Sequence, residues 1–287
     1  MCPRLFHALY NNSGSTLMKD FIADYHTHTK YCDGKDTPER MAELAYEKGF
    51  SVLGFSGHGY TAFDGSYCMS LEGTKAYLSD IAALKEKYRG KMTVLAGIEA
   101  DMNAPMPEGD FDYVIGSSHY VPLGGKYYPI DCNKEDFKRL VDEGFGGDYE
   151  ALCEVYFKEL ESLPDKIPCD IIGHFDLVTK YAEIYDLKRG ERYYKAAYAA
   201  LDKLLARGIP FEVNVGAITR GYRTVPYPEE CFLRYIKERG GEIFVTGDCH
   251  SAENLCKNLD TGIDYAKKCG FTHRLVITRG SKHRCAI

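Results

Sequence analysis

The organisation of this chain follows from the segment Phe21-Ile22-Ala23-Asp24-Tyr25-His26-Thr27-His28-Thr29, an apolar-leaning run that ends in two histidines. Side chains two apart on a strand point the same way, so the pattern predicts that His26 and His28 share one face. Two imidazoles side by side at a strand end can hold a metal ion that takes further ligands from elsewhere. A single His-x-His pair is as compatible with chance as with a metal site. The interpretation therefore depends on how the later strands end.

The composition narrows the class of protein. The chain has 287 residues, 45% of them hydrophobic and 27% charged, which suits one large α/β domain or two small ones. A formal net charge of −6 and the lack of any Lys/Arg block argue against a nucleic-acid partner. No apolar run approaches the roughly 18 residues that a membrane span requires. The oligomeric state is left open.

The first residues and the cysteines both bear on location. Residues 1–20 contain one Arg and a short apolar stretch broken by His7, which is too weak for a secretory signal. We expect these residues to form a poorly ordered extension, with Met18 as an alternative start. The eleven cysteines are scattered singly with no Cys-x-x-Cys pair, which is typical of small apolar fillers in a reducing compartment. We therefore expect a cytoplasmic protein.

Strand-like and helix-like segments alternate along the chain, which predicts a parallel β-sheet, open or closed into a barrel. The predicted strands are 22–26, 52–56, 93–99, 112–118, 170–174, 210–215, 242–247 and 274–278. The predicted helices are 37–49, 71–88, 148–163, 192–207, 229–239 and 253–268. Since no low-complexity linker or internal repeat interrupts them, we expect a single domain. The irregular segment 122–147 is expected to form a lid or an insertion over the site.

Metal-ligating residue types recur where the predicted strands end. The series is His26 and His28, Asp33 in the following loop, His58, Glu99, His119, His174, Asp248 and His250. A β/α barrel places its active site at the carboxyl ends of its strands, whereas random placement would scatter the histidines over helices and loops. Each of His58, His119 and His174 taken alone is as compatible with a structural role. Taken together, the series indicates a metal site.

The number of ligands indicates more than one ion. Nine nitrogen and oxygen ligands with no thiolate pattern exceed what one tetrahedral site can use. They suit a cluster of two or three divalent ions such as Zn, Mn or Fe. A carboxylate can bridge two ions where an imidazole cannot, so Glu99 and Asp248 are the candidate bridging ligands.

With these motifs the sequence resembles the polymerase and histidinol phosphatase (PHP) family of metallophosphoesterases. The matching motifs run in family order over residues 24–250: His26-Thr27-His28-Thr29, Cys32-Asp33-Gly34, His58, Gly97-Ile98-Glu99, His119, Gly173-His174 and Gly247-Asp248-x-His250. The resemblance implies a distorted (β/α)7 TIM-like barrel over residues 21–287 with a trinuclear metal centre. The predicted strand 274–278 would then be peripheral to the barrel.

The resemblance also implies how the ligands are shared. One ion would be held by His26, His28, Glu99 and Asp248, a second by Glu99, His119 and His174, and a third by Asp33, His58 and His250. The segment Ser56-Gly57-His58 departs from the commoner Thr-Asp-His of the family, which implies changed surroundings of the ligand but no lost ligand.

Several segments resemble the stand-alone histidinol-phosphatases within the family. They are 111–120, 173–178, Glu212-Val213-Asn214, 220–223 and 226–228. This resemblance implies that a metal-activated water hydrolyses L-histidinol phosphate, a small phosphomonoester, to L-histidinol and phosphate, a step of histidine biosynthesis. Arg220 and Arg223 follow the sixth strand and are candidates for binding the phosphoryl oxygens, with Lys180 a weaker one. Either Asp33 or His250 could protonate the leaving oxygen as a catalytic acid.

Three alternatives remain at this level. The same metals could hydrolyse another small phosphate ester, a nucleotide or single-stranded nucleic acid, although the acidic composition argues against a polynucleotide. An amidohydrolase-type barrel also begins with His-x-His, but it typically has a Lys bridge or fewer histidines. A metal-binding regulatory protein without catalysis is the third alternative, and the complete ligand series argues against it.

Overall fold

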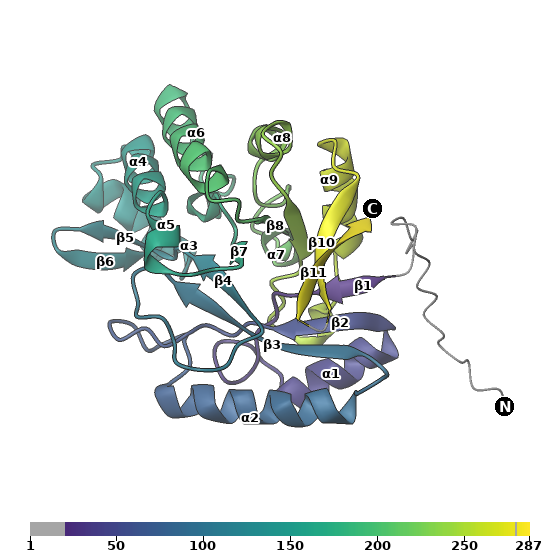
Figure 1. The fold of residues 1–287 in the computed structure, drawn as a ribbon. Coiled ribbons are helices and arrows are strands. Elements are labelled where there is room, and N and C mark those ends of the chain that lie inside the picture. The colour runs from purple at the N-terminus through teal and green to yellow at the C-terminus, as the bar shows by residue number, and fades with distance from the viewer. Residues whose placement is uncertain (1–20, 279) are drawn as a thin grey trace.

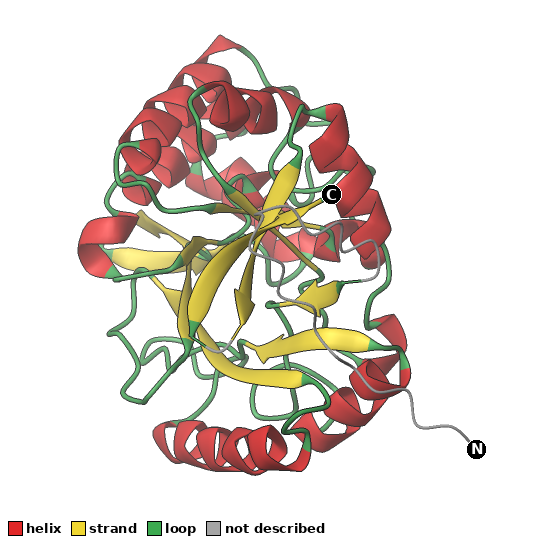
Figure 2. Ribbon diagram, turned by 45° about the vertical axis from the view of Figure 1, so that its right-hand side comes forward, coloured by secondary structure: helices red, strands yellow, loops and turns green. Residues whose placement is uncertain are grey.

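The computed structural model describes residues 21–278 and 280–287, and it confirms an α/β fold built on a parallel sheet. Seven parallel strands are ordered β1-β2-β3-β4-β7-β8-β9. Their bounds are β1 Ile22–Asp24, β2 Phe50–Phe55, β3 Thr93–Asp101, β4 Tyr113–Ser117, β7 Ile171–Ile172, β8 Phe211–Asn214 and β9 Ile243–Thr246. Figure 2 shows these strands in the middle of the molecule with the helices around them. The predicted extension 1–20 lies outside the described residues.

The helices connect successive strands and cover the outside of the sheet (Figure 1). They are α1 Pro38–Glu47, α2 Leu71–Lys87, α3 Lys134–Arg139, α4 Tyr149–Leu160, α5 Leu163–Lys166, α6 Glu191–Leu205, α7 Gly216–Thr219, α8 Glu230–Glu238 and α9 Leu259–Lys268. The predicted start of α1 is confirmed, because the Thr37 side chain accepts a hydrogen bond from the Arg40 N–H and Pro38 occupies the first turn. None of the helices in the described part of the chain is both long and apolar enough to cross a lipid bilayer.

The predicted helix 253–268 is wrong over residues 253–258. Ala252–Asn254 forms a separate 3-10 turn, and α9 begins only at Leu259. The interruption lies at Cys256 and Asn258, whose φ angles of 67° and 63° are in the left-handed region that a continuous right-handed helix excludes.

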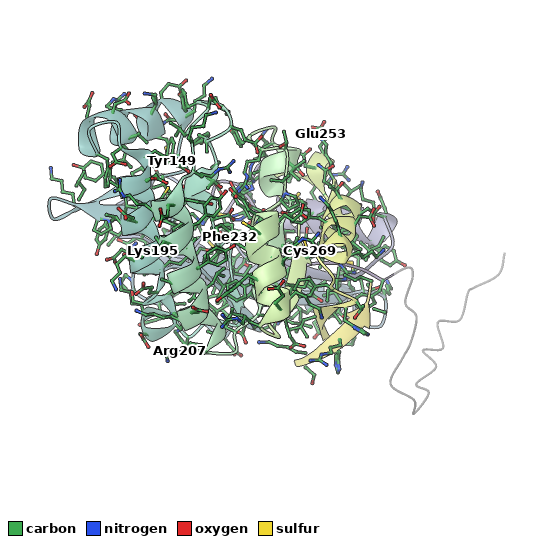
Figure 3. All side chains as sticks on the ribbon, turned by 90° about the horizontal axis from the view of Figure 1, so that it is seen from above. Tyr149, Lys195, Arg207, Phe232, Glu253 and Cys269 are labelled. Atoms are coloured by element: carbon green, nitrogen blue, oxygen red, sulfur yellow. The ribbon has the colours of Figure 1, made fainter. Side chains whose placement is uncertain are left out.

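The contact between α6 and α8 on the outside of the sheet is aromatic. Phe232 of α8 points toward α6, which lies beside it (Figure 3), and its ring centroid is 5.8 Å from that of Tyr193 and 5.3 Å from that of Tyr198. Because Phe232 is fully buried, this contact fixes the spacing between the two helices.

The sheet becomes a ring through one short junction. Beyond the ends of β1 and β9, Thr27 and Cys249 form a single parallel bridge. The His28 N–H donates to the Cys249 carbonyl at 2.8 Å, and the Cys249 N–H donates to the His26 carbonyl at 2.9 Å. The β1–β9 junction is therefore a single bridge just outside the two strands. The β7–β8 pairing is similarly short, with the one pair Ile172 and Phe211.

The interior of the ring is apolar at the amino ends of the strands. Tyr113 of β4 crosses this interior, and a Cβ at Gly97 of β3 would lie only 2.2 Å from its ring. Gly97 therefore makes room for the tyrosine. The interior cluster contains Ala23, Tyr25, Val52, Leu95, Tyr113, Ile115, Ile171 and Phe244, together with Leu275, Val276, Ile277 and Cys285.

The last two strands close the amino end of the ring. The predicted strand 274–278 corresponds to β10 (His273–Thr278), which pairs antiparallel with β11 (Ser281–Ala286) outside the seven-stranded sheet, as the resemblance implied. Tyr25 links this hairpin to the first strand, because its hydroxyl donates to the Ile277 carbonyl at 3.3 Å and accepts from the Ile277 N–H at 2.8 Å.

The irregular segment 122–147 contains part of a second hairpin. β5 (Tyr120–Leu123) pairs antiparallel with β6 (Lys126–Pro129), and α3 and a π-helical turn at Leu140–Gly144 follow. This hairpin lies at the carboxyl end of β4, where the candidate site is found.

Candidate metal centre

A single carboxylate, that of Glu99, lies at the centre of the site. Glu99 is near the carboxyl end of β3 and is 1% exposed. One oxygen, Oε2, lies 3.1 Å from His26 Nε2, 3.5 Å from His28 Nε2 and 3.0 Å from His58 Nδ1. The other oxygen, Oε1, lies 2.9 Å from His174 Nε2 and 3.3 Å from His119 Nε2. Five imidazoles from the ends of four strands thus converge on one buried carboxylate.

A second carboxylate, that of Asp248, lies beside the imidazoles of His26 and His28. Its Oδ1 lies 3.5 Å from His28 Nε2 and 3.9 Å from His26 Nε2. Asp248 follows the end of β9 and has a φ of 47°, in the left-handed region that few non-glycine residues adopt. Such a backbone outlier at a strand end is typical of a functional site.

Further acids orient the imidazoles from behind. Glu212 Oε1 lies 2.5 Å from His26 Nδ1, and Asp101 Oδ2 lies 3.1 Å from His119 Nδ1. Each contact engages Nδ1 and leaves Nε2 directed at Glu99, as in the carboxylate–histidine arrangement of metal sites. The sequence pattern assigns no ligand or orienting role to Glu212 or Asp101. Two features of the sequence indicate them: Asp101 lies two residues after Glu99 on β3, and Glu212 lies inside the fully buried strand β8.

The residues present fit a cluster of cations. His26 Nε2, His28 Nε2 and Glu99 Oε2 are buried and have no hydrogen-bond partner among the described residues. Buried polar atoms are rarely left without partners, so three that face one another indicate a shared ligand. Their donor types, imidazole nitrogen and carboxylate oxygen, are those that Zn, Mn and Fe accept.

Charge in the site favours the same conclusion. Although burial opposes a charged imidazole, the carboxylates of Glu212 and Glu99 hold the pKa of His26 well above its usual value. Although burial also opposes a charged carboxylate, the imidazoles of His26 and His58 hold the pKa of Glu99 well below its usual range. The buried carboxylates therefore attract positive charge, which protons or metal ions can supply.

Donor atoms of the predicted ligands form three groups, in each of which they lie within 4.8 Å of one another. The groups are His28, Asp33, His58 and His250; His26, His28 and Asp248; and His58, Glu99 and His119. This partition differs from the one implied by the resemblance, since His28 also joins the group of Asp33 and His58 also joins that of Glu99. His174 is outside these groups, but it contacts Glu99 as described above.

The site opens into a pocket of about 230 Å³. Lys180 and Arg220, two of the three predicted substrate-binding residues, line it. Arg220 NH2 donates to Asp248 Oδ2 at 2.9 Å, and Lys180 Nζ donates to the Asp131 carbonyl at 2.7 Å. The pocket also receives Asp131 and the hairpin residues Tyr120 and Pro129, so the segment predicted to lie over the site does form part of its wall.

The third predicted substrate-binding residue, Arg223, does not line the pocket. Its side chain is 1% exposed and lies against Asp176, with NH1 3.5 Å from Asp176 Oδ2. The structure therefore separates Arg223 from Arg220, although only two residues lie between their positions in the chain.

Asp33 and His250, the two candidate acids, lie on the open side of the pocket. His250 Nε2 is 3.1 Å from Asp33 Oδ2, and the Asp33 side chain is 34% exposed. Burial and the nearby charge of His28 lower the pKa of His250 to about 4, whereas His58 and His250 hold that of Asp33 well below its usual range despite burial. At neutral pH this arrangement gives a neutral imidazole and an ionised carboxylate.

A ring of parallel strands with imidazoles and carboxylates at its carboxyl ends defines a metal-dependent hydrolase of the β/α-barrel class. Comparison with known sequences identifies the family: the PHP domain profile matches residues 24–215, and the chain belongs to this family. PHP phosphoesterases bind several divalent metal ions.

Individual relatives agree with this family. The histidinol-phosphatase of Bacillus subtilis is 25% identical over 259 residues, which cover 81% of this chain and 94% of the relative. A solved structure from Listeria monocytogenes has a TM-score of 0.72 at 19% identity and covers 84% of this chain and 99% of its own. The histidinol phosphate phosphatase of Lactococcus lactis, solved with zinc, L-histidinol and phosphate, has a TM-score of 0.61 at 18% identity, covering 91% and 98%. At these identities the two structures show a shared fold.

Proposed function

We propose that this protein is a metal-dependent phosphomonoesterase that hydrolyses L-histidinol phosphate to L-histidinol and phosphate. The observation that carries the proposal is the convergence of five imidazoles on the buried Glu99, beside a pocket whose wall holds Arg220 and Lys180. The substrate is inferred from the relatives named above, and the reaction class from the family and the site.

The nine predicted residues would hold two or three divalent ions: His26, His28, Asp33, His58, Glu99, His119, His174, Asp248 and His250. When bound, such ions supply a water-derived nucleophile at neutral pH and neutralise charge on the phosphoryl group. Glu99 and Asp248 are the proposed shared ligands, because each carboxylate has donor atoms close to several imidazoles.

The cationic wall would bind the phosphoryl oxygens. Arg220 uses NH1 and NH2 on Asp248, and its planar guanidinium has five N–H donors in all, so donors remain for a phosphoryl group. Lys180 is fixed by Asp131, which leaves its ammonium at the pocket surface. These contacts hold both cations in place before the substrate arrives, so less free energy is lost in ordering the two side chains during the reaction.

The leaving oxygen would be released toward the open side of the pocket. Asp33 and His250 lie there and remain the proposed groups for delivering its proton, directly or through water. The metal-bound state changes the charge around both residues, so a pH–rate profile of the metal-loaded enzyme is the appropriate readout. A cytoplasmic location, a small-molecule partner and the absence of a nucleic-acid partner stay predictions of the sequence.

The decisive experiment compares phosphate release by metal-replete protein from L-histidinol phosphate, p-nitrophenyl phosphate and a nucleoside monophosphate. We expect kcat/KM for L-histidinol phosphate to exceed the other two by at least about a hundredfold, the size of effect that a specific polar pocket produces. Similar low values on all three would keep the phosphoesterase and reject this substrate. A preference for the nucleotide would favour the alternative phosphoester.

A further inference from the structure

Arg223 is buried in a polar cluster that lies outside the candidate site. Its NH1 donates to Thr179 Oγ1 at 2.7 Å and lies 3.5 Å from Asp176 Oδ2. Its guanidinium carbon is 4.2 Å from the centre of the Tyr227 ring, and its NH2 is 4.0 Å from Glu229 Oε1. The cluster therefore surrounds one guanidinium with two acids, a hydroxyl and an aromatic face.

This cluster joins two segments that both contribute to the site. Asp176 and Thr179 follow β7 and the candidate ligand His174, whereas Arg223 belongs to the connection between β8 and α8, which also carries Arg220. The Glu229 N–H donates to Asp176 Oδ2 at 3.1 Å, so the far end of this connection is bound to the same carboxylate. Arg223 thus links the phosphate-facing arginine segment to the strand end that carries His174.

The two ends of the connection are also joined by backbone hydrogen bonds between Asn214 and Tyr227. The Asn214 N–H donates to the Tyr227 carbonyl at 2.9 Å, and the Tyr227 N–H donates to the Asn214 carbonyl at 3.0 Å. Between these anchors the chain reverses at Gly221, whose φ is 77°. Arg220 and Arg223 then lie on opposite sides of the turn, Arg220 toward Asp248 and Arg223 toward Asp176.

The cluster is costly to bury. Arg223 Nε and NH2, Asp176 Oδ1 and the Tyr227 hydroxyl are all buried and have no hydrogen-bond partner among the described residues. A buried ion pair with unsatisfied atoms contributes little stability, and an apolar substitute of similar size often performs as well. The best-supported role of a buried ion pair is to favour one conformation of the chain over several similar ones.

We propose that Arg223 is a positioning residue: through Asp176 and Thr179 it fixes where the neighbouring Arg220 meets the phosphoryl group. This proposal rests on the proposed phosphoesterase function but not on the identity of the substrate alcohol. Inorganic phosphate, the common product of every phosphomonoester, is therefore the probe that tests it.

The test measures inhibition by inorganic phosphate, kcat, KM and bound metal for Arg223→Met, with p-nitrophenyl phosphate as substrate. Because a misplacement of about 1 Å can cost roughly a hundredfold, we expect kcat/KM to fall by about 10- to 100-fold. The inhibition constant for phosphate should rise by a similar factor at unchanged metal content. Arg223→Lys, which keeps a cation beside Asp176, should recover part of both losses.

Two further variants give controls. Arg192→Met removes an exposed arginine that pairs with Asp148 and Glu154 on the outer helices, and it should leave the inhibition constant unchanged. Thr179→Val removes one hydrogen bond to Arg223 without burying a charge, and it should raise the inhibition constant for phosphate by a smaller factor. It takes the place of Arg223→Met in the test if Arg223→Met does not fold. This variant keeps the proposal testable.

The result that would overturn the proposal is a lower melting temperature or a lower metal content with an unchanged inhibition constant for phosphate. Arg223 would then stabilise the fold or support His174 without positioning Arg220. Failure of the substrate assignment is a separate outcome, because it would appear as a low rate on L-histidinol phosphate in the wild-type protein with normal phosphate inhibition.

Discussion

The two ends of the barrel differ along the same inward faces of the same strands. On β3, Leu95 is near the amino end and Glu99, four residues later on the same face, is at the centre of the metal site. On the β9 segment, Phe244 and Asp248 show the same change. The amino end is filled by apolar side chains under the β10–β11 hairpin, and the carboxyl end by acids and imidazoles.

This difference separates what stabilises the fold from what performs the chemistry. At the amino end, Tyr25 satisfies its hydroxyl on Ile277, and the surrounding side chains are apolar and buried. At the carboxyl end, His26 and Glu99 leave buried atoms without partners among the described residues. Burying such groups costs stability, so their retention indicates that cations complete the site.

The largest expected effect comes from removing the ions. Dialysis of metal-loaded protein against a chelator should abolish phosphate release and lower the melting temperature, because ions that bind the folded state stabilise it by mass action. Adding back Zn, Mn or Fe should restore both properties. Unchanged activity in protein shown to be metal-free by elemental analysis would show that the chemistry at the carboxyl end does not need ions.

The next effect tests Glu99 itself. Glu99→Gln keeps the shape of the side chain but removes the charge that faces five imidazoles, so we expect kcat/KM to fall by roughly 10³-fold with fewer bound ions. The melting temperature of the metal-free protein should change little, because the acid contributes to the site more than to the fold. The matched control is Glu242→Gln at the amino end, where the acid pairs with the exposed Arg284.

A substitution in the amino-end cluster should give the opposite pattern. Ile277→Ala deletes buried methyl groups beside Tyr25, and we expect the free energy of unfolding to fall by roughly 2–5 kcal/mol. The value of kcat/KM at 25 °C and the metal content should stay within about twofold of the wild type. Ile184→Ala, at a position that is 44% exposed, is the control for the loss of an isoleucine. Loss of bound metal in Ile277→Ala would show that the two ends are coupled.

The sequence predicts the carboxyl end better than the amino end for a physical reason. Ligands must be of a few residue types and must follow strands, so His26, Glu99 and Asp248 could be recognised from local pattern alone. Partners such as Glu212 behind His26 are 186 positions away in the chain, and local periodicity does not reveal them. Local pattern does not predict the polar strand β11 either, because its stability comes from pairing with β10 and only Cys285 of it joins the interior.

Arg223 shows the limit of reasoning from proximity in the chain. The sequence places it beside Arg220 in a loop at the right end of the barrel, which predicts the same role for both. The left-handed turn at Gly221 sends the two side chains to different neighbours, and no residue type nearby distinguishes phosphate from a buried Asp176 as the partner. Only the three-dimensional arrangement separates substrate binding from positioning.

The smallest expected effect concerns two thiols, the buried Cys249 at the carboxyl end and the half-buried Cys169 just before β7. Burial raises the pKa of Cys249 to about 12 and that of Cys169 to about 11. Because each raised pKa leaves the thiol neutral at pH 8, both should alkylate slowly, and the labelling rate should rise about tenfold per pH unit below the pKa. Among the cysteines of residues 21–287, the exposed Cys132 should label first in a time course followed by peptide mass spectrometry.

Removal of the ions should then distinguish the two thiols. The backbone of Cys249 forms the bridge that closes the ring, and its neighbours Asp248 and His250 are candidate ligands, so a chelator should speed its labelling several-fold through local opening. Cys169 lies at the opposite end and should label at an unchanged rate. Equal acceleration of both thiols would mean that the ions hold the whole barrel together. The division between a stabilising end and a chemical end would then not describe this molecule.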